Sequence, residues 1–187
     1  MDPIIKEAVD AVAKGELIVF PTDTVYGIGC DPFNEEALEK LFAAKKRPKE
    51  KSVPLLVDSI ETAESLGEID DQCRLLILQH WPGALTVIVP QKASLPVQVT
   101  KDNTVALRMP AHEDLLELLT ATGGVLAATS ANISGKPALT SYDEAYATFA
   151  EIADVVVPGI VKEKAASTIV DCTMGAPRIV REGPVEL

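Results

Sequence analysis

The sequence predicts an α/β (α+β) fold in which residues 1–187 form a single domain with a mixed sheet. Its length of 187 residues matches one domain, since domains commonly hold about 100–200 residues. Hydrophobic residues make up 47% and charged residues 24% of the chain, which is typical of a globular protein with a core. Strand and helix patterns interleave, but several strands are adjacent near the end, and this favours a mixed sheet over a purely parallel one.

The first elements have recognisable start and stop residues. Asp2 is a suitable N-cap and Pro3 fits the first position of a helix. Apolar residues then recur on one helical face as far as Ala13, and Gly15 can end the helix. The apolar run over residues 16–20 predicts a strand.

A loop is expected next, over residues 21–29, because its proline, threonines and glycines break regular structure. Asn34 can cap a second helix. That helix is expected to end within residues 45–47, because Pro48 cannot simply continue it. A short strand is then predicted over residues 53–57.

Short helices and strands alternate in the rest of the chain. Ser59 can cap a helix that ends near Gly67, and Asp70 or Asp71 can cap another that continues through Leu78. Further helices are expected over about 112–120 and 141–153, and strands over 85–89, 104–110, 125–129, 154–157, 167–171 and 178–182.

The composition restricts the classes of partner. A net charge of −11 argues against broad, nonspecific binding to nucleic acid. Residues 45–51 (KKRPKEK) hold five of the 17 basic residues, which indicates either a local anion site or a solvated helix end. Three separated cysteines and two histidines support neither a disulfide framework nor a protein-built zinc site.

The chain shows no pattern typical of a membrane protein. The start of the chain lacks the basic start and apolar core of a signal peptide. No apolar run reaches the roughly 18 residues that a membrane span requires. We therefore expect a cytoplasmic protein without membrane contact.

Two polar loops follow predicted strands and are candidates for ligand binding. The first, residues 21–29, places hydroxyls, the Asp23 carboxylate and a phenol beside glycines, which suits a small polar molecule. The second, residues 130–137, offers hydroxyl and amide groups that can hold phosphate or metal oxygens. Each loop can equally be a turn whose polar groups satisfy one another.

Three cations could complete a binding cleft with these loops. Lys45 and Arg47 alternate at a helix end, where they can converge on phosphates. Arg108 follows an apolar strand, at a sheet end where ligands of α/β proteins gather; a surface ion pair is the alternative. The loops contain no serine–histidine pair and the chain has no Walker-type phosphate loop. This combination favours phosphoryl or nucleotidyl transfer by positioning and charge neutralisation.

Seven motifs carry a resemblance to a known family. They are FPTDTVYGIG, KxRPKxK, HWPGALTVIV, TVALRMP, ATSANISGKPA, STIVD and RIVREG. Any one of them is unspecific, but all seven occur here in the order of the YrdC-like threonylcarbamoyl-AMP synthases. The resemblance runs from about Glu16 to Gly183 and is to the short, single-domain form, since longer members carry an additional C-terminal domain.

The resemblance implies a fold and a reaction. The fold would be the YrdC-like twisted mixed sheet with flanking helices around a concave cleft. The reaction would convert L-threonine, bicarbonate or CO2, and ATP into threonylcarbamoyl-AMP and pyrophosphate, with Mg2+ accompanying ATP. A separate threonylcarbamoyl transferase complex would then modify the tRNA adenosine next to the anticodon.

The resemblance also implies roles for individual residues. Lys45, Arg47, Ser130 and Asn132 would form the catalytic set around the ATP phosphates. Further ATP contacts are implied at Lys51, Thr104 and Arg181. Threonine contacts are implied at Thr22, Thr24, Tyr26, Arg108, Ala128 and Ser167, with Arg108 at the substrate carboxylate. No metal-ligating side chain is implied.

Two positions depart from the family pattern, and two other functions compete with it. Ala138 stands where a serine is frequent and Leu56 where longer members have a histidine, so one nucleotide contact and one threonine contact are in doubt. One alternative is a noncatalytic double-stranded RNA- or tRNA-binding protein; the low aromatic content of 4% offers it few stacking platforms. The other is a carbamoyl transferase related by fold.

Overall fold

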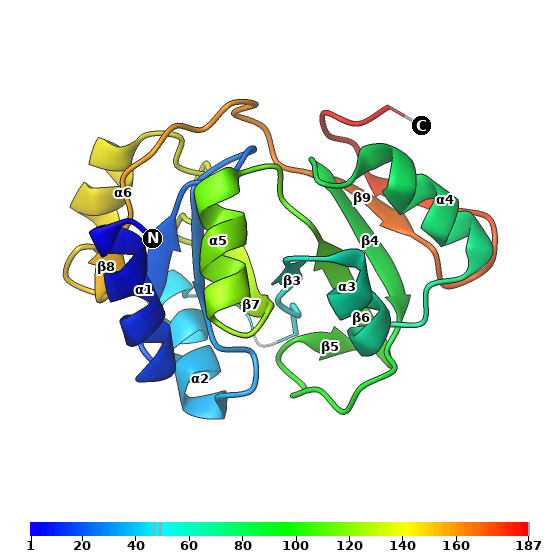
Figure 1. Cartoon of the computed structure of the whole chain (residues 1–187), viewed down its shortest axis with the longest axis horizontal. Coiled ribbons are helices and arrows are strands. Elements are labelled where there is room, and N and C mark those ends of the chain that lie inside the picture. The colour runs from blue at the N-terminus through cyan, green and yellow to red at the C-terminus, as the bar shows by residue number, and fades with distance from the viewer. Residues whose placement is uncertain (47, 49, 187) are drawn as a thin grey trace.

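The chain folds into one twisted sheet with helices packed on both faces (Figure 1). The structure is a computed structural model and describes residues 1–46, 48 and 50–186. Its strands are β1 (Ile18–Phe20), β2 (Gly27–Cys30), β3 (Leu55–Val57), β4 (Leu85–Pro90), β5 (Thr100–Lys101), β6 (Thr104–Arg108), β7 (Val125–Ser130), β8 (Val155–Val156), β9 (Thr168–Asp171) and β10 (Arg178–Arg181).

The sheet is mixed, as the sequence predicts. Its strand order is β10-β9-β4-β6-β3-β7-β2-β1-β8, with β5 beside β6. Parallel pairs join β1 with β8, β3 with β6, and β4 with β9. The other strand pairs are antiparallel. Elements far apart in sequence therefore meet in the middle of the sheet.

Six helices flank the sheet in the part of the chain that the structure describes. They are α1 (Pro3–Ala13), α2 (Glu35–Lys45), α3 (Ile60–Leu66), α4 (Asp71–His80), α5 (Glu113–Ala121) and α6 (Tyr142–Phe149). Asp2, Asn34, Ser59 and Asp70 each accept a hydrogen bond at their helix N-terminus, as the sequence predicts. These caps satisfy backbone donors that would otherwise lack partners.

Side-chain alternation along the strands builds two apolar clusters, one on each face of the sheet. In β3, Leu55 belongs to the cluster beneath α2, α3, α4 and α6, whereas Leu56 belongs to the cluster beneath α1 and α5. Helices α1 and α5 lie side by side (Figure 1) and contact β1, β3, β7 and β8. On the same face, β4, β6 and β9 instead line a cavity.

The structure corrects the sequence-based assignment at three places. Residues 27–29, expected in a loop, belong to strand β2 (Gly27–Cys30). Gly27 and Gly29 are needed there, because a Cβ would lie 2.8 Å from the Phe20 ring and 2.5 Å from the Ala127 carbonyl oxygen; glycine here permits close strand packing and does not break the strand. The two-residue strand β5 was not predicted, and α6 ends at Phe149 instead of residue 153.

Candidate active site

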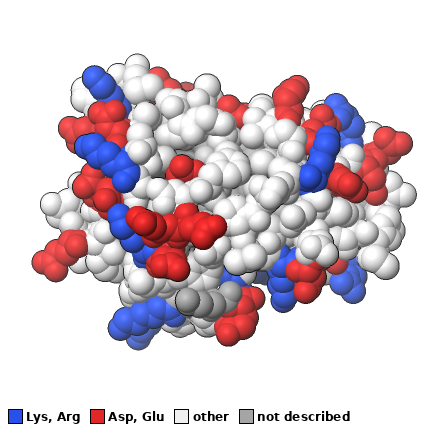
Figure 2. Space-filling model, turned by 90° about the horizontal axis from the view of Figure 1, so that it is seen from below, with Lys and Arg blue, Asp and Glu red and all other residues white. Residues whose placement is uncertain are grey.

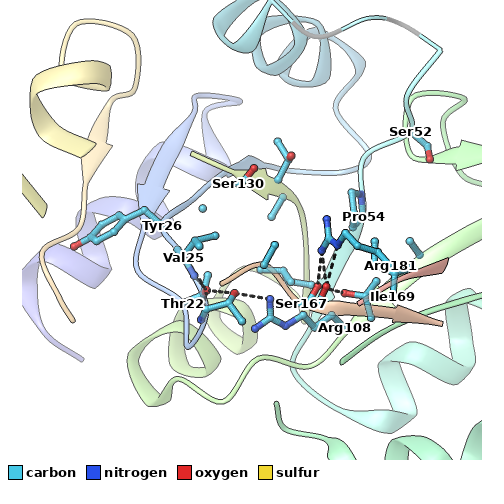
Figure 3. Close-up of a pocket in the computed structure, with 18 of the residues that line it drawn as sticks. Thr22, Val25, Tyr26, Ser52, Pro54, Arg108, Ser130, Ser167, Ile169 and Arg181 are labelled. Atoms are coloured by element: carbon cyan, nitrogen blue, oxygen red, sulfur yellow. Dashed lines mark hydrogen bonds between the residues drawn. The ribbon is translucent and has the colours of Figure 1, made fainter. Parts of the chain in front are cut away.

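The cavity has a volume of about 340 Å³ and opens on the sheet face that α1 and α5 leave uncovered. Polar side chains from separate segments of the chain line it; those used below come from six segments and are Thr22, Thr24, Thr86, Arg108, Ser130, Ser167 and Arg181. Figure 3 shows how Thr22, Arg108, Ser167 and Arg181 converge on its floor. The volume lies at the lower end of the roughly 300–1,000 Å³ usual for ligand sites.

Arg108 is held by a buried network at the end of β6. Its Nη2 donates to the Asp23 carboxylate at 2.6 Å, its Nη1 to the Thr24 hydroxyl at 2.9 Å, and its Nε to the Gly83 carbonyl at 3.0 Å. Burial lowers the pKa of Arg108, and the neighbouring Asp23 charge opposes that change. A guanidinium has five N–H donors, so three of the five are used by described residues and two have no partner among them.

The sequence singled out Arg108 and Thr24 but not the partnership with Asp23. Asp23 is only 4% exposed and forms a buried ion pair with Arg108. A buried charge requires a partner, so a lone carboxylate inside an otherwise uncharged loop was the feature that could have revealed this pair.

Thr22 combines a structural role with its place in the cavity wall. Its hydroxyl accepts from the backbone N–H groups of Thr24 and Val25 and donates to the Val25 carbonyl at 2.7 Å. It also lies 2.9 Å from the Thr24 hydroxyl. The loop is therefore a self-satisfied turn that still presents Thr24 to the cavity.

Ser167 and Arg181 lie together at the other side of the cavity floor. Arg181 donates to the Ser167 carbonyl from Nε at 3.0 Å and from Nη2 at 2.6 Å, and Nη2 also reaches the Ser167 hydroxyl at 3.2 Å. Burial, followed by repulsion from Arg108, lowers the pKa of Arg181. Two guanidinium groups thus flank one cavity, which suits an anionic ligand.

Lys45 joins the end of α2 to the loop after β7. Its ammonium donates to the Ser130 carbonyl, to the Asn132 carbonyl at 2.8 Å and to the Asn132 Oδ1 at 3.0 Å. The Ser130 hydroxyl donates to the same Asn132 Oδ1 at 2.7 Å. Lys45, Ser130 and Asn132 are therefore brought together, with Ser130 in the cavity wall. Arg47, the fourth member of the expected set, lies outside the described residues.

Of the remaining residues that the sequence analysis named, some line the cavity and others do not. Ala128 and Leu56 line it, and the backbone of β6 carries Thr104 on the same face as the cavity-lining Ala106. The Thr104 hydroxyl, however, donates to the Lys101 carbonyl. Thr104 and the exposed Lys51 are not among the described residues that line the cavity.

Tyr26 reaches the cavity wall, but its phenol lies elsewhere. The ring points away from Arg108 and Ser167 (Figure 3), and its hydroxyl donates to the Gly159 carbonyl at 3.0 Å. The side chain is fully buried. Tyr26 therefore fixes the segment after β8 and does not direct its phenol at a ligand.

Replacing Tyr26 with phenylalanine is expected to reduce stability without weakening ligand binding in the cavity. The free energy of unfolding should fall by about 1–2 kcal/mol, because the Gly159 carbonyl loses its donor. Burial raises the pKa of Tyr26 from 10.0 to about 12. The neutral phenol is thus favoured in the folded protein, and the wild type should lose stability as pH rises from about 10 to about 12. Urea denaturation at several pH values should show that the variant loses less stability than the wild type over this pH range. Binding of L-threonine, the ligand that the resemblance implies, should stay within about threefold of the wild type; a larger loss would contradict this assignment.

Charge on the molecular surface is mixed outside the cavity. On the face shown in Figure 2, Lys and Arg side chains lie scattered among Asp and Glu. A larger groove, of about 870 Å³, lies beside α2 and is lined partly by Glu36, Glu39 and Lys40. Its charged groups are surface side chains and form no network like that around Arg108, so the smaller cavity is the better candidate.

Two further observations concern metals and membranes. Among the described residues, no group of three His, Cys, Asp or Glu side chains could hold a metal ion. None of the described helices is both long and apolar enough to cross a bilayer.

Comparison with known proteins identifies relatives along nearly the whole chain. The family model Sua5_yciO_yrdC, described as "Telomere recombination", matches residues 10–183. A Mycobacterium leprae protein named "Putative threonylcarbamoyl-AMP synthase" is 44% identical over 186 residues, covering 98% of this chain and 84% of the relative. The Pyrococcus abyssi Sua5 structure complexed with L-threonine superimposes with a TM-score of 0.90 at 36% identity, covering 96% of this chain and 54% of that one. Escherichia coli YciO superimposes with a TM-score of 0.89 at 25% identity, covering 97% of this chain and 90% of that chain.

Proposed function

Because the chain belongs to the Sua5/YciO/YrdC family, we propose that it is a threonylcarbamoyl-AMP synthase, an ATP-dependent nucleotidyltransferase. The observation that carries the proposal is the buried Arg108, which lines a cavity of about 340 Å³ and has two N–H donors without a partner among the described residues. A relative of the same fold has been solved with L-threonine. The substrates of the present protein would be L-threonine, bicarbonate or CO2, and ATP.

Arg108 would receive the carboxylate of threonine. Its guanidinium is already oriented by Asp23, Thr24 and Gly83, so little side-chain entropy is lost when the ligand binds. Planar N–H donors match the geometry of a carboxylate. Thr24 and Ala128 would close the same end of the cavity.

The ATP phosphates would lie at the Ser130 end of the cavity. Ser130 lies in that wall, and Lys45 donates to its carbonyl and to Asn132 in the loop that follows. We assign Arg47 and Lys51 to the same group of phosphate contacts. Arg181, from the far side, would contact the nucleotide. Mg2+ would enter with ATP and be held largely by phosphate oxygens and water.

Two bond-forming steps would follow. The neutral amine of threonine forms a C–N bond with CO2, which bicarbonate supplies by taking up a proton and losing water. The carbamic acid formed then loses its proton to solvent and becomes a carbamate. A carbamate oxygen then attacks the α-phosphorus of ATP, the bond to the bridging oxygen breaks, and pyrophosphate leaves. Both partners in the second step are anionic, so Arg108 and Arg181 would offset their repulsion. The product would pass to a transferase complex acting on tRNA in the cytoplasm.

Pyrophosphate release tests this proposal directly. Release is expected only when L-threonine, ATP and bicarbonate are all present, with bicarbonate removed by working in CO2-free buffer. Release without threonine, or none from a folded protein that binds ATP, would contradict it. A reaction that required carbamoyl phosphate in place of bicarbonate would indicate a carbamoyl transferase. Binding of tRNA that weakens steeply with salt, without ATP turnover, would indicate a noncatalytic RNA-binding protein.

A further inference from the structure

Thr86 is a buried cavity residue to which the resemblance gives no role. It lies in β4, is 3% exposed and lines the cavity. Its hydroxyl lies 2.8 Å from the Ser167 hydroxyl, and either oxygen can be the donor. Ser167 also accepts from Nη2 of Arg181. Three side chains therefore form one continuous hydrogen-bonded chain.

Counting protons shows that this chain is incomplete. Two hydroxyls carry two protons, and one of them occupies the bond between Thr86 and Ser167. Arg181 is a donor only, so it takes neither proton. Among the described residues, neither hydroxyl has a further partner. One O–H donor is therefore left over at the cavity surface.

The order of donation favours Thr86 as the last donor. Arg181 is cationic and polarises the Ser167 hydroxyl, which becomes the better proton donor toward Thr86. Hydrogen bonds that run head to tail strengthen one another. Thr86 then directs its own O–H away from Ser167 and into the cavity.

Thr86 and Arg108 project from neighbouring strands onto the same face. Val87 of β4 pairs with Leu107 of β6, so the adjacent residues Thr86 and Arg108 both point to the opposite face from that pair. Side chains placed in this way on paired strands lie within reach of one ligand. Both line the cavity.

We propose that Thr86, at the end of the Arg181–Ser167–Thr86 chain, donates a hydrogen bond to the α-carboxylate of the amino-acid substrate and completes the subsite with Arg108. This rests on the proposed function. A carboxylate only accepts hydrogen bonds, so it matches one leftover O–H and two leftover N–H donors. The subsite thereby selects for an anionic carboxylate over a neutral amide.

Calorimetric titration of L-threonine and L-threoninamide into the wild type and three variants tests the proposal. Thr86→Val keeps the branched shape, Thr86→Ser keeps the hydroxyl, and Ser167→Ala removes the middle of the chain. For L-threonine, Thr86→Val and Ser167→Ala should raise the Kd at least tenfold, as expected for a lost hydrogen bond to a charged group. Thr86→Ser should stay within about threefold of the wild type.

L-Threoninamide distinguishes a carboxylate contact from a general packing defect. Thr86→Val should change its Kd less than about threefold, and the KM for ATP should change equally little. Unchanged L-threonine binding in Thr86→Val would overturn the proposal, as would equal weakening of threonine and threoninamide. If Thr86→Val does not fold, the same two criteria apply to Ser167→Ala. A wild type that bound no L-threonine would overturn the proposed function itself.

Discussion

Replacing Asp23 with alanine is expected to lower the free energy of unfolding by about 3–5 kcal/mol, because it leaves the Arg108 guanidinium buried without its counter-charge. Arg108 and Asp23 are 6% and 4% exposed, and their closest atoms are 2.6 Å apart. The hydrogen bonds from Arg108 to the Thr24 hydroxyl and the Gly83 carbonyl remain, but these acceptors are neutral and cannot balance the charge of the guanidinium. Urea denaturation followed by circular dichroism measures the loss.

Two companion variants make this result specific. Asp10→Ala removes a carboxylate from the exposed surface of α1 and should change stability by less than about 0.5 kcal/mol. The double variant Asp23→Leu/Arg108→Met replaces the pair by apolar groups and should recover most of the stability while binding no L-threonine. If Asp23→Ala were as stable as Asp10→Ala, the ion pair between Asp23 and Arg108 would make no contribution to the free energy of unfolding.

The sequence predicted the fold well where local chemistry decided the structure. The caps Asp2, Asn34, Ser59 and Asp70 mark helix starts because each needs only its own neighbours. Strand β2 was missed because its glycines are required by contacts between strands. A Cβ at these positions would clash with the Phe20 ring or with Ala127 on the neighbouring strand β7. Such contacts become visible only once the strands are assembled.

The same distinction applies to the site. Arg108 was found from its position after an apolar strand, Thr24 from its place in a polar loop, and Ser167 from the family resemblance. All three line one cavity. The direction of the Tyr26 phenol, toward Gly159, depends on a segment 133 residues further along the chain. The pairing of Asp23 with Arg108 and the contact of Thr86 with Ser167 were missed, because the two partners of each pair are more than 80 residues apart in the sequence.

Replacing Lys45 with methionine is expected to lower kcat/KM for ATP at least 100-fold. Its ammonium donates to the Ser130 carbonyl and to both oxygens of Asn132, and its own carbonyl accepts from the Ser134 N–H at 2.9 Å. The variant keeps this backbone bond and loses the three bonds from the ammonium. Bonds from charged donors contribute about 1.5–3 kcal/mol each, and about 2.7 kcal/mol corresponds to a 100-fold change in rate.

Because Lys45 is 2% exposed, its removal acts on the position of the Ser130–Asn132 loop as well as on charge. Lys40→Met is the matched control, since Lys40 lies on the same helix and its exposed pair with Glu16 contributes at most about 1 kcal/mol. That variant should retain at least half of the wild-type kcat/KM. Steady-state pyrophosphate release with ATP as the varied substrate, together with an unfolding curve for each variant, separates turnover from folding. If Lys45→Met folded and turned over ATP as Lys40→Met does, the loop after β7 would keep its position without the Lys45 ammonium, and neither these hydrogen bonds nor the charge of Lys45 would be needed for nucleotide transfer.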